Sequence, residues 1–472
     1  MSQTIIVDPV TRIEGHAKVL LDLDDGGKVK SAGLVVNELR GFERILVGMQ
    51  AATMPAVTAR ICGVCPSAHA IAAAKAIDAA THAEVPVAGH LLRELLYMGH
   101  VIHSHAVHLF ALAGPDLLFG VDSDPAKRNI VGIVEAHPVI AKKALRLRSL
   151  GQKINETLGG RGVHPVTVVA GGLSFVPTPE RMASVTEMAT EALALVQELA
   201  PPIIQALLAL LEKSPQLAGI KQETAYLGTV RNGKLNLYDG TLRLVGADGK
   251  ILKEFAAAAY AEHLVEHTYD WSYMKPVFAK VDGKEVVYRV GPLARVNLAD
   301  GMETPLADAA LTAFRAQWGR VVHVTALQEH ARLIELLYAC EKAVLLAKDP
   351  AARGNTLAPV TFTAGRGVAH VEAPRGTLLH DYQVDAAGVV RSANLIVATQ
   401  HNYAAINRSL TQSAEALGVK GPADGNLLNG LEYTIRTYDP CLSCATHAVG
   451  RMPMQVSVRK DGVVLYDVRR DS

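Results

Sequence analysis

Cysteine is scarce in this sequence, with five residues among 472. An odd number of cysteines in a chain of this length argues against a disulfide framework and favours a reducing compartment, so we expect a cytoplasmic protein. Neither sign of charge is in excess, since the formal net charge is +1. This balance argues against the strongly basic kind of surface that binds nucleic acid or acidic lipid.

A signal peptide and a membrane-spanning run are also missing from the pattern. The first residues contain no basic region followed by an apolar core, which predicts no secretory signal. The longest uncharged run, 95–115, contains four histidines and a serine. It therefore predicts a buried core helix and no transmembrane segment.

Hydrophobic residues, by contrast, make up 49% of the chain, enough for a large core in one extended domain or two intimate ones. Aromatic residues account for only 5%, whereas alanine and leucine are plentiful and favour helices. We predict an α+β fold that is mainly α. It has a large helical-bundle body with small β-meanders or hairpins at the N-terminus, in a mid-chain insertion and near the C-terminus.

Hydrophobic periodicity and turn residues divide the chain further. One domain over 1–447 comprises a β-meander (1–40), a helical region (43–220), a β-rich insertion (221–295) and a region of helices, strands and a C-terminal metal loop (300–447). Helices are predicted at 68–81, 91–113, 141–158, 182–213, within 305–347 and at 403–417, and strands at 368–371, 378–384 and 389–398. A C-terminal extension, 448–472, contains a predicted hairpin at 455–466.

Four of the five cysteines form two C-x-x-C pairs, Cys62 with Cys65 and Cys441 with Cys444. Such a loop places two sulfurs on one side of a tight turn, and four thiolates suit zinc, nickel or iron. The pairs stand far beyond the separation of roughly 15–20 residues found in zinc ribbons. Spacing therefore predicts a metal site and leaves a structural zinc and a catalytic centre open, while a thioredoxin-like redox pair is disfavoured.

Other candidate ligands have plainer interpretations. Cys340 has no second cysteine spaced to join it, so we expect a small buried core residue. His100, His103, His105 and His108 fall on different faces of a predicted helix, which favours core packing or the lining of a water channel over a metal site.

Five motifs link the sequence to a known family. In order they are Asp8–His16, Arg40–Glu43, Arg60–His69, Glu372–Gly376 and Asp439–His447. They resemble those of the large subunit of nickel–iron hydrogenases, and the similarity runs nearly from end to end. The phrases Trp271-Ser-Tyr-Met274 and Gly376-Thr-Leu-Leu379 are most similar to the cytosolic, multisubunit branch of that family.

The resemblance implies a nickel–iron centre. Cys62 and Cys441 would be terminal nickel ligands, and Cys65 and Cys444 would bridge nickel to iron, which also holds carbon monoxide and two cyanides. Glu14 would take a proton from the Cys441 sulfur and pass it outward, in keeping with a carboxylate near a thiolate. On composition alone, Glu14 would be a solvated side chain at the start of a strand.

The resemblance also places an arginine over the metals. Arg375 would lie near the open coordination position and polarise hydrogen or hold a cyanide, because its guanidinium is a permanent fork of donors. Pro374 would fix its approach and Thr399 would donate to the other cyanide. Asp116 and Asp439 would pair with Arg375. Without the resemblance, these residues predict an ordinary buried ion-pair cluster.

A second, hard metal is implied as well. Glu43, the backbone carbonyl of Leu395 and the ring of His447 match a family site for magnesium or another divalent ion, completed by waters. Without the resemblance, Glu43 is a surface helix charge and His447 a loop residue. His69 would donate toward a sulfur or a bound ligand.

The remaining implications concern partners. No cysteines are left for an iron–sulfur cluster, so the chain would dock a small subunit that carries one. Further subunits would pass electrons to NAD(P), a deazaflavin, or a heterodisulfide reductase or ferredoxin. Maturation factors would load the metals, and a dedicated protease would remove the extension after His447.

Two other functions remain in competition. A quinone-site subunit of the respiratory complex I type is a structural relative of this family but lacks the four cysteines. A zinc-stapled scaffold would have no chemistry. Metal content separates the three: nickel and iron, neither, or zinc alone.

Overall fold

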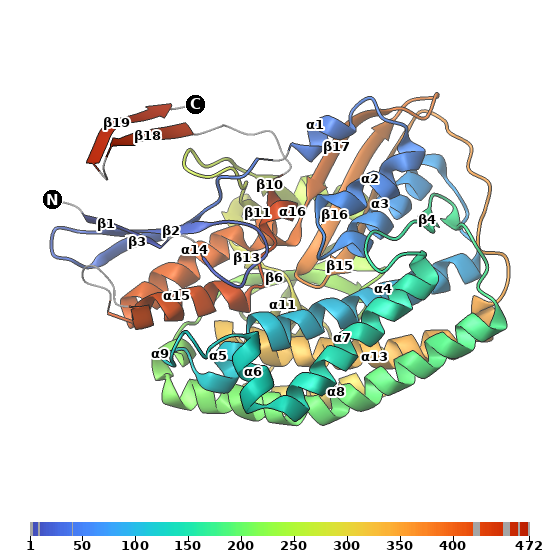
Figure 1. Cartoon of the computed structure of the whole chain (residues 1–472). Coiled ribbons are helices and arrows are strands. Elements are labelled where there is room, and N and C mark those ends of the chain that lie inside the picture. The colour runs from blue at the N-terminus through green and yellow to red at the C-terminus, as the bar shows by residue number, and fades with distance from the viewer. Residues whose placement is uncertain are drawn as a thin grey trace.

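Long helices form the lower half of the molecule in Figure 1. The computed structural model describes residues 3–7, 10–39, 41–418, 425–446, 454–460 and 463–470. Four helices pack beside one another in the order α7–α4–α13–α8, with α7 also contacting α8. Their bounds are α4 (Val87–Val107), α7 (Pro138–Gly159), α8 (Pro179–Lys213) and α13 (Gln328–Lys348). A π-helical turn, His108–Leu112, continues α4.

Helix α8 is the one helix in the described ranges that is long and apolar enough to cross a membrane by length and composition. Its buried residues recur every three or four positions, for example Val185, Ala189, Ala192 and Val196. The opposite face is polar and exposed and includes Glu198. This is the pattern of an amphipathic helix that covers a protein core, and α8 packs against α13 and α7.

Three antiparallel strands at the N-terminus form the predicted meander, in the order β1 (Gln3–Val7), β2 (Lys18–Leu23), β3 (Val29–Val35). Strand β3 packs on α14 (Ala398–Ala416), and the Leu34 N–H donates to Asn407 Oδ1 at 3.0 Å. The segment after β1, which carries Glu14, is thereby anchored to the C-terminal half of the chain.

The mid-chain stretch is rich in strands. One sheet has the order β14-β7-β6-β8-β9 with β13 beside β6, and a second has the order β10-β11-β12. The strands are β6 (Ala225–Arg231), β7 (Lys234–Leu235), β8 (Thr241–Val245), β9 (Ile251–Phe255), β10 (Leu264–Glu266), β11 (Val277–Val281), β12 (Lys284–Val286), β13 (Tyr288–Arg289) and β14 (Gly301–Met302).

A third sheet, β15 (Gly365–Ala373), β16 (Gly376–Val384) and β17 (Val390–Ile396), lies against α3 (Pro66–Thr81). Its first turn holds Arg375. Gly376 closes that turn with φ +136°, and a Cβ there would meet Val290 Cγ2 at 2.2 Å. Glycine is therefore required where the sheet delivers Arg375 to the interior.

Two helix boundaries differ from the prediction. Helix α14 begins at Ala398, five residues before the predicted start, because Gln400 Oε1 accepts the Val397 N–H at 3.0 Å and caps the first turn. Helix α15 (Gly425–Thr437) was not predicted. Its glycine, asparagines and β-branched residues have low helix propensity, so packing against α14 decides its conformation.

The other elements are short. They are α1 (Phe42–Leu46), η1 (Ala51–Thr53), α2 (Met54–Thr58), η2 (Ala59–Ile61), α5 (Gly114–Phe119), α6 (Ile130–Ala136), β4 (Val168–Val169), β5 (Gly172–Leu173), α9 (Pro215–Ala218), η4 (Ala257–Ala259), α10 (Tyr260–His263), α11 (Pro292–Leu298), α12 (Pro305–Trp318), η5 (Thr325–Leu327), η6 (Pro350–Ala352) and α16 (Leu442–Ala445). In the extension, β18 (Met454–Lys460) pairs antiparallel with β19 (Val463–Arg470), as the hairpin prediction expects.

Candidate metal centre

The two cysteine pairs meet in the interior. All four Sγ atoms lie within 4.8 Å of one another, and all four side chains are buried. Cys62 Sγ lies 3.2 Å from Cys441 Sγ, and Cys65 Sγ lies 3.0 Å from Cys444 Sγ, although 379 residues separate the members of each contact. The prediction that both pairs serve one site is confirmed.

Local structure explains how the sulfurs reach one point. Cys62 ends η2 and Cys65 precedes α3, while Cys441 precedes α16. The backbone of Glu14 forms a parallel bridge with Cys441, and its carbonyl accepts the Leu442 N–H at 3.1 Å. Three distant segments are thus joined before any metal is considered.

The donor set is soft. Burial raises the pKa of Cys441 and of Cys444, whereas hydrogen bonds from Cys441, Cys444 and Cys65 lower the pKa of Cys62. In the described part of the chain, this is the one cluster of cysteine, histidine or acidic residues close enough to hold a metal. Four buried sulfurs fit nickel, iron or zinc and do not fit a hard ion.

Arg375 lies beside the sulfurs, as predicted. It shares a pocket of about 20 Å³ with Cys65, Cys441 and Cys444, and its Nη2 is 3.1 Å from Asp439 Oδ1. Burial opposes the charge of Arg375, but Asp439 and the nearby sulfurs raise the pKa of the guanidinium. The Nε and Nη1 groups of Arg375 are buried without a hydrogen-bond partner in the protein. Such donors indicate that a bound acceptor belongs in this pocket.

Asp439 is held by more than Arg375. His108 Nδ1 lies 3.2 Å from Asp439 Oδ1, and Arg332 Nη1 lies 3.7 Å from Oδ2. Burial alone would raise the pKa of Asp439, but Arg375 and His108 lower it below its usual range. Local sequence does not indicate that His108 takes this role, because its partner lies more than 300 positions away.

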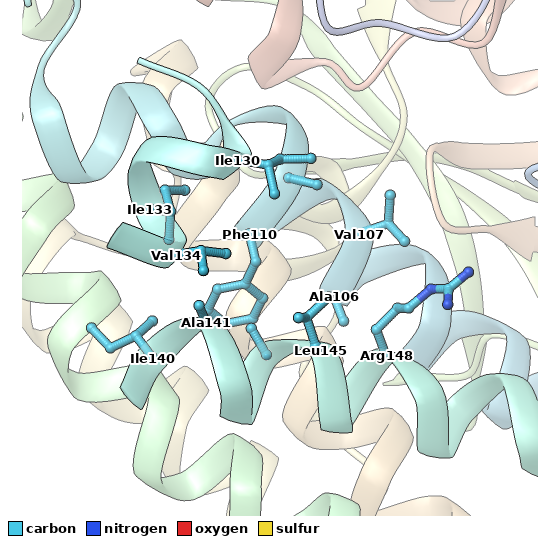
Figure 2. A pocket seen from close by; sticks show the side chains of 12 residues that line it. Ala106, Val107, Phe110, Ile130, Ile133, Val134, Ile140, Ala141, Leu145 and Arg148 are labelled. Atoms are coloured by element: carbon cyan, nitrogen blue, oxygen red, sulfur yellow. The ribbon is translucent and has the colours of Figure 1, made fainter. Parts of the chain in front are cut away.

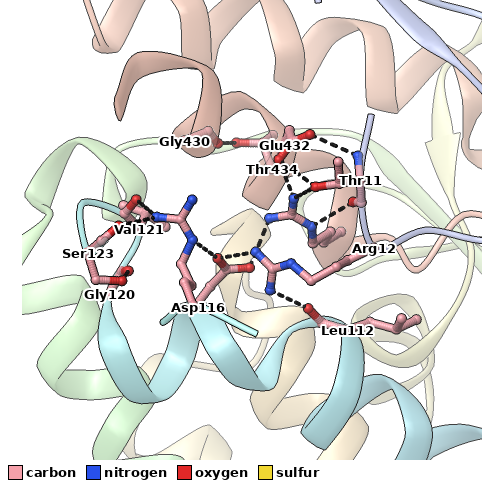
Figure 3. A network of polar contacts seen from close by, with 12 residues as sticks. Thr11, Arg12, Leu112, Asp116, Gly120, Val121, Ser123, Gly430, Glu432 and Thr434 are labelled. Carbon is pink, nitrogen blue, oxygen red and sulfur yellow. Dashed lines mark hydrogen bonds and ion pairs between the residues drawn. The ribbon is translucent and has the colours of Figure 1, made fainter. Parts of the chain in front are cut away.

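The expected pairing of Asp116 with Arg375 is wrong. Asp116 Oδ1 accepts from Arg12 Nη2 at 2.6 Å, and Asp116 Oδ2 accepts from Arg436 Nη1 at 3.0 Å (Figure 3). Arg128 Nε lies 3.4 Å from Oδ1. Helix α5 turns Asp116 toward these three guanidiniums, so it anchors the segment before Glu14 to α15 and makes no contact with the metal pocket.

We expect Asp116→Asn to lower the free energy of unfolding by about 3–5 kcal/mol, because it leaves buried guanidiniums without their counter-charge. Urea unfolding of the isolated variant measures this loss. Asp122→Asn, which alters an exposed carboxylate on the same loop, is the matched control. Equal unfolding midpoints for the two variants would contradict the anchoring role.

Glu14 reaches the sulfur that the resemblance assigns to it. Its Oε2 lies 3.1 Å from Cys441 Sγ and accepts the Ser443 N–H at 3.0 Å. The side chain is half-buried, so it connects the enclosed sulfur to the outside of the protein. Gly15 follows with φ +84°, and a Cβ there would meet Leu442 Cβ at 2.8 Å. This close approach sets the position of Glu14.

Thr399 and Pro374 line up with their predicted places. Thr399 Oγ1 accepts the Cys441 N–H at 2.9 Å, which leaves its hydroxyl hydrogen to donate into the pocket that Thr399 also lines. The Pro374 carbonyl accepts from Arg295 Nη2 at 3.1 Å. Arg295 is buried between Glu335 and Glu372, an ion-pair network that fixes the turn and that the sequence analysis missed.

Two of the three predicted ligands of the hard metal come together. Glu43 Oε1 accepts the Leu395 N–H at 2.7 Å, although the two residues belong to distant segments. His447 lies outside the described residues. The magnesium site therefore stays a prediction.

The other histidines and Cys340 behave as core residues. His105 pairs with Glu335 at 3.1 Å, and burial lowers the pKa of His100 to about 3 and that of His103 to about 4. Cys340 is fully buried, and burial raises the pKa of its thiol. None of these residues joins the cysteine cluster.

A separate apolar cavity of about 160 Å³ lies between α4 with its π-turn, α6 and α7. Figure 2 shows Phe110 standing among Val134, Ala141 and Leu145. No predicted site residue lines this cavity. Its walls offer no ligands, so the chemistry belongs to the much smaller pocket beneath Arg375.

The fold and the cysteine cluster define a redox enzyme subunit with a buried, thiolate-bound metal centre. The family model described as "Nickel-dependent hydrogenase" matches residues 40–129 and 234–447, and one described as "HoxL-like" matches residues 4–39. The chain belongs to the nickel-dependent hydrogenase family and is its large, catalytic subunit.

Individual relatives agree with the family. A subunit of the F420-non-reducing hydrogenase vhu of Methanococcus voltae is 43% identical over 88% of this chain and 98% of its own length. The NAD-reducing hydrogenase HoxS subunit beta of Cupriavidus necator is 37% identical over 99% of this chain and all of its own. A crystal structure of an NAD+-reducing NiFe-hydrogenase in the H2-reduced state superposes with a TM-score of 0.90, at 37% identity, over 94% of this chain and 99% of its own.

These findings decide among the functions that the sequence left open. The four sulfurs converge on one point, which a subunit of the complex I type without these cysteines cannot provide. Family membership in turn favours nickel with iron over a structural zinc. The enzyme is a hydrogenase, an oxidoreductase that acts on H2.

Proposed function

We propose that this subunit splits dihydrogen heterolytically and reversibly, with Cys62 and Cys441 as terminal nickel ligands and with Cys65 and Cys444 bridging nickel to iron. The convergence of four buried sulfurs beneath one guanidinium carries the proposal. When bound, the metals supply a soft, redox-active centre at which hydrogen is polarised. The protein supplies a proton acceptor, a fixed positive charge and an enclosed pocket.

Glu14 is the proton acceptor in this proposal. The 3.1 Å contact between its Oε2 and Cys441 Sγ lets a proton move directly from sulfur to carboxylate. The Ser443 N–H holds the same oxygen in place. Because Glu14 is half-buried, the proton can continue outward to water.

Arg375 and Thr399 would hold the carbon monoxide and cyanide ligands of iron. The unpartnered Nε and Nη1 groups of Arg375 and the free hydroxyl hydrogen of Thr399 are donors around the same pocket. A cyanide nitrogen is a suitable acceptor for each. Glu43, the Leu395 carbonyl and His447 would hold magnesium or another divalent ion, and the proximity of Glu43 to Leu395 supports this.

Electrons would leave through an iron–sulfur small subunit. The loop between Cys62 and Cys65 exposes Gly63, so the protein surface comes within one residue of a metal ligand. This supports close approach of a partner's cluster. The relatives' names separate NAD reduction from hydrogenases that do not reduce F420. We propose that further subunits set the acceptor, whether NAD(P), a deazaflavin, or a heterodisulfide reductase or ferredoxin, and that the complex is cytoplasmic.

Metal analysis with a hydrogen-dependent dye-reduction assay on the co-purified complex tests this function. We expect nickel and iron in the wild type, and loss of nickel with at least 100-fold lower activity in Cys65→Ser, because the centre loses a bridging sulfur. Cys340→Ala removes a thiol outside the cluster and should keep both metals and activity. Zinc alone, or neither metal, in an otherwise folded wild-type complex would refute the proposal.

The extension 448–472 is the second testable part. Thr446 is buried and its carbonyl accepts the Gly41 N–H at 3.4 Å, so the chain must leave the interior directly after the metal loop. This supports removal of the extension by a protease once maturation factors have loaded nickel. The intact mass of nickel-loaded protein should end at His447. A full-length mass with full activity would contradict processing.

A further inference from the structure

A chain of hydrogen bonds leads from the bridging sulfur of Cys444 into the third sheet. His69 Nε2 lies 3.4 Å from Cys444 Sγ, and His69 Nδ1 lies 3.1 Å from His380 Nε2. His380 Nδ1 lies 2.7 Å from the Tyr382 hydroxyl oxygen. His380 and Tyr382 stand two positions apart on β16, so both side chains point from one face of the sheet toward α3.

All members of this chain are buried. His69 is 1% exposed, and His380 and Tyr382 are fully enclosed. Water cannot supply a missing hydrogen bond there, so each ring nitrogen has to act as donor or acceptor toward its neighbour. A neutral imidazole carries one N–H and one lone pair, and the partner of one nitrogen decides the state of the other.

The direction of the chain follows from the sulfur. A metal-bound Cys444 is a thiolate and accepts only, so the hydrogen of His69 must be on Nε2. Nδ1 of His69 is then an acceptor and requires a hydrogen on His380 Nε2. Nδ1 of His380 is an acceptor in turn, and the Tyr382 hydroxyl must donate to it.

We infer that His380 and Tyr382 are positioning residues that fix the tautomer of His69 and keep its Nε2–H aimed at the bridging sulfur. The inference rests on the proposed function, because it takes Cys444 as a metal-bound thiolate. An N–H donated to sulfur withdraws electron density and favours the reduced metal, so the hydroxyl of Tyr382 raises the reduction potential of the centre across two imidazoles.

The midpoint potential of the nickel, followed by electron paramagnetic resonance in the purified complex, tests the inference. Tyr382→Phe removes the first donor, so His380 and then His69 can exchange tautomers and the N–H to sulfur is lost. His380→Leu breaks the chain in the middle. For both we expect a shift to lower potential by about 59 mV, which is a tenfold change in the oxidised-to-reduced ratio of a one-electron couple.

Two further variants separate this role from simple packing. His380→Gln places an amide N–H near the original Nε2 and should keep the wild-type potential. Tyr433→Phe removes a buried hydroxyl that has no hydrogen-bond partner, and it should also leave the potential unchanged. Equal potentials for Tyr382→Phe and Tyr433→Phe would overturn the inference, as would equal shifts for His380→Gln and His380→Leu.

The proposed function is judged separately, by the metals and hydrogen-dependent activity of the wild-type complex. If His380→Leu does not load nickel, Tyr382→Phe still decides, because that change removes a single oxygen atom. A wild-type complex that is active while Tyr382→Phe has no effect on the potential would retain the function and reject the tautomer chain.

Discussion

Glu14→Gln is expected to keep nickel and iron at wild-type levels while hydrogen-dependent dye reduction falls by about 100- to 10,000-fold, the range that a positioned general base contributes. The glutamine carbonyl can still accept the Ser443 N–H, so the segment beside Cys441 should keep its conformation. The amide cannot take a proton from the Cys441 sulfur. Only the proton step is removed.

A nearby glutamate provides the control. Glu38 pairs with His16 at 2.6 Å on the exposed side of the same N-terminal region, and Glu38→Gln should retain full activity. Metal content per protein and dye reduction per nickel are measured for both variants. Wild-type turnover in Glu14→Gln would remove Glu14 from the proton path, whereas loss of metal in that variant would assign it a structural role.

Arg375→Lys is expected to lower dye reduction per nickel by about 100- to 1,000-fold, the usual effect of removing one preorganised donor from a reacting centre. Lysine preserves the charge and can still pair with Asp439, which Arg375 approaches at 3.1 Å. It cannot reproduce the planar fork whose Nε and Nη1 groups are left for a bound acceptor.

Infrared spectra of the metal-bound cyanides give a second measurement. A lost N–H donor should shift at least one cyanide stretching band in Arg375→Lys. Arg366→Lys is the control, because Arg366 forks to Asp381 at 3.0 and 2.7 Å at the exposed end of the same sheet. Near-normal turnover and unshifted bands in Arg375→Lys would contradict a role for the fork.

Several features were predictable because their signal is local. Helical periodicity located α3, α4, α7 and α8 to within a few residues, and alternation located the N-terminal meander. The two C-x-x-C loops marked the metal ligands, since their chemistry is written in spacing. The start of α14 and the existence of α15 escaped, because a side-chain cap and packing outweigh intrinsic propensity there.

Pairing between distant charges was the harder part. Asp116 and Asp439 are both buried carboxylates, and nothing in their neighbourhoods along the chain tells which one meets Arg375. The structure pairs Asp439 with Arg375 and His108, and it pairs Asp116 with Arg12, Arg128 and Arg436. Each of these choices leaves another charge satisfied, so the assignment depends on the whole set of buried partners.

The sequence by itself determined that four sulfurs bind a metal, that helices dominate and that the motifs are those of one enzyme family. Only the tertiary structure decided which residues stand around the sulfurs, because that depends on segments up to 427 positions apart, such as Glu14 and Cys441. Local patterns follow from bond geometry and hydrophobic period. Contacts across the core follow from close packing, which selects one partner for each buried polar group from the entire chain.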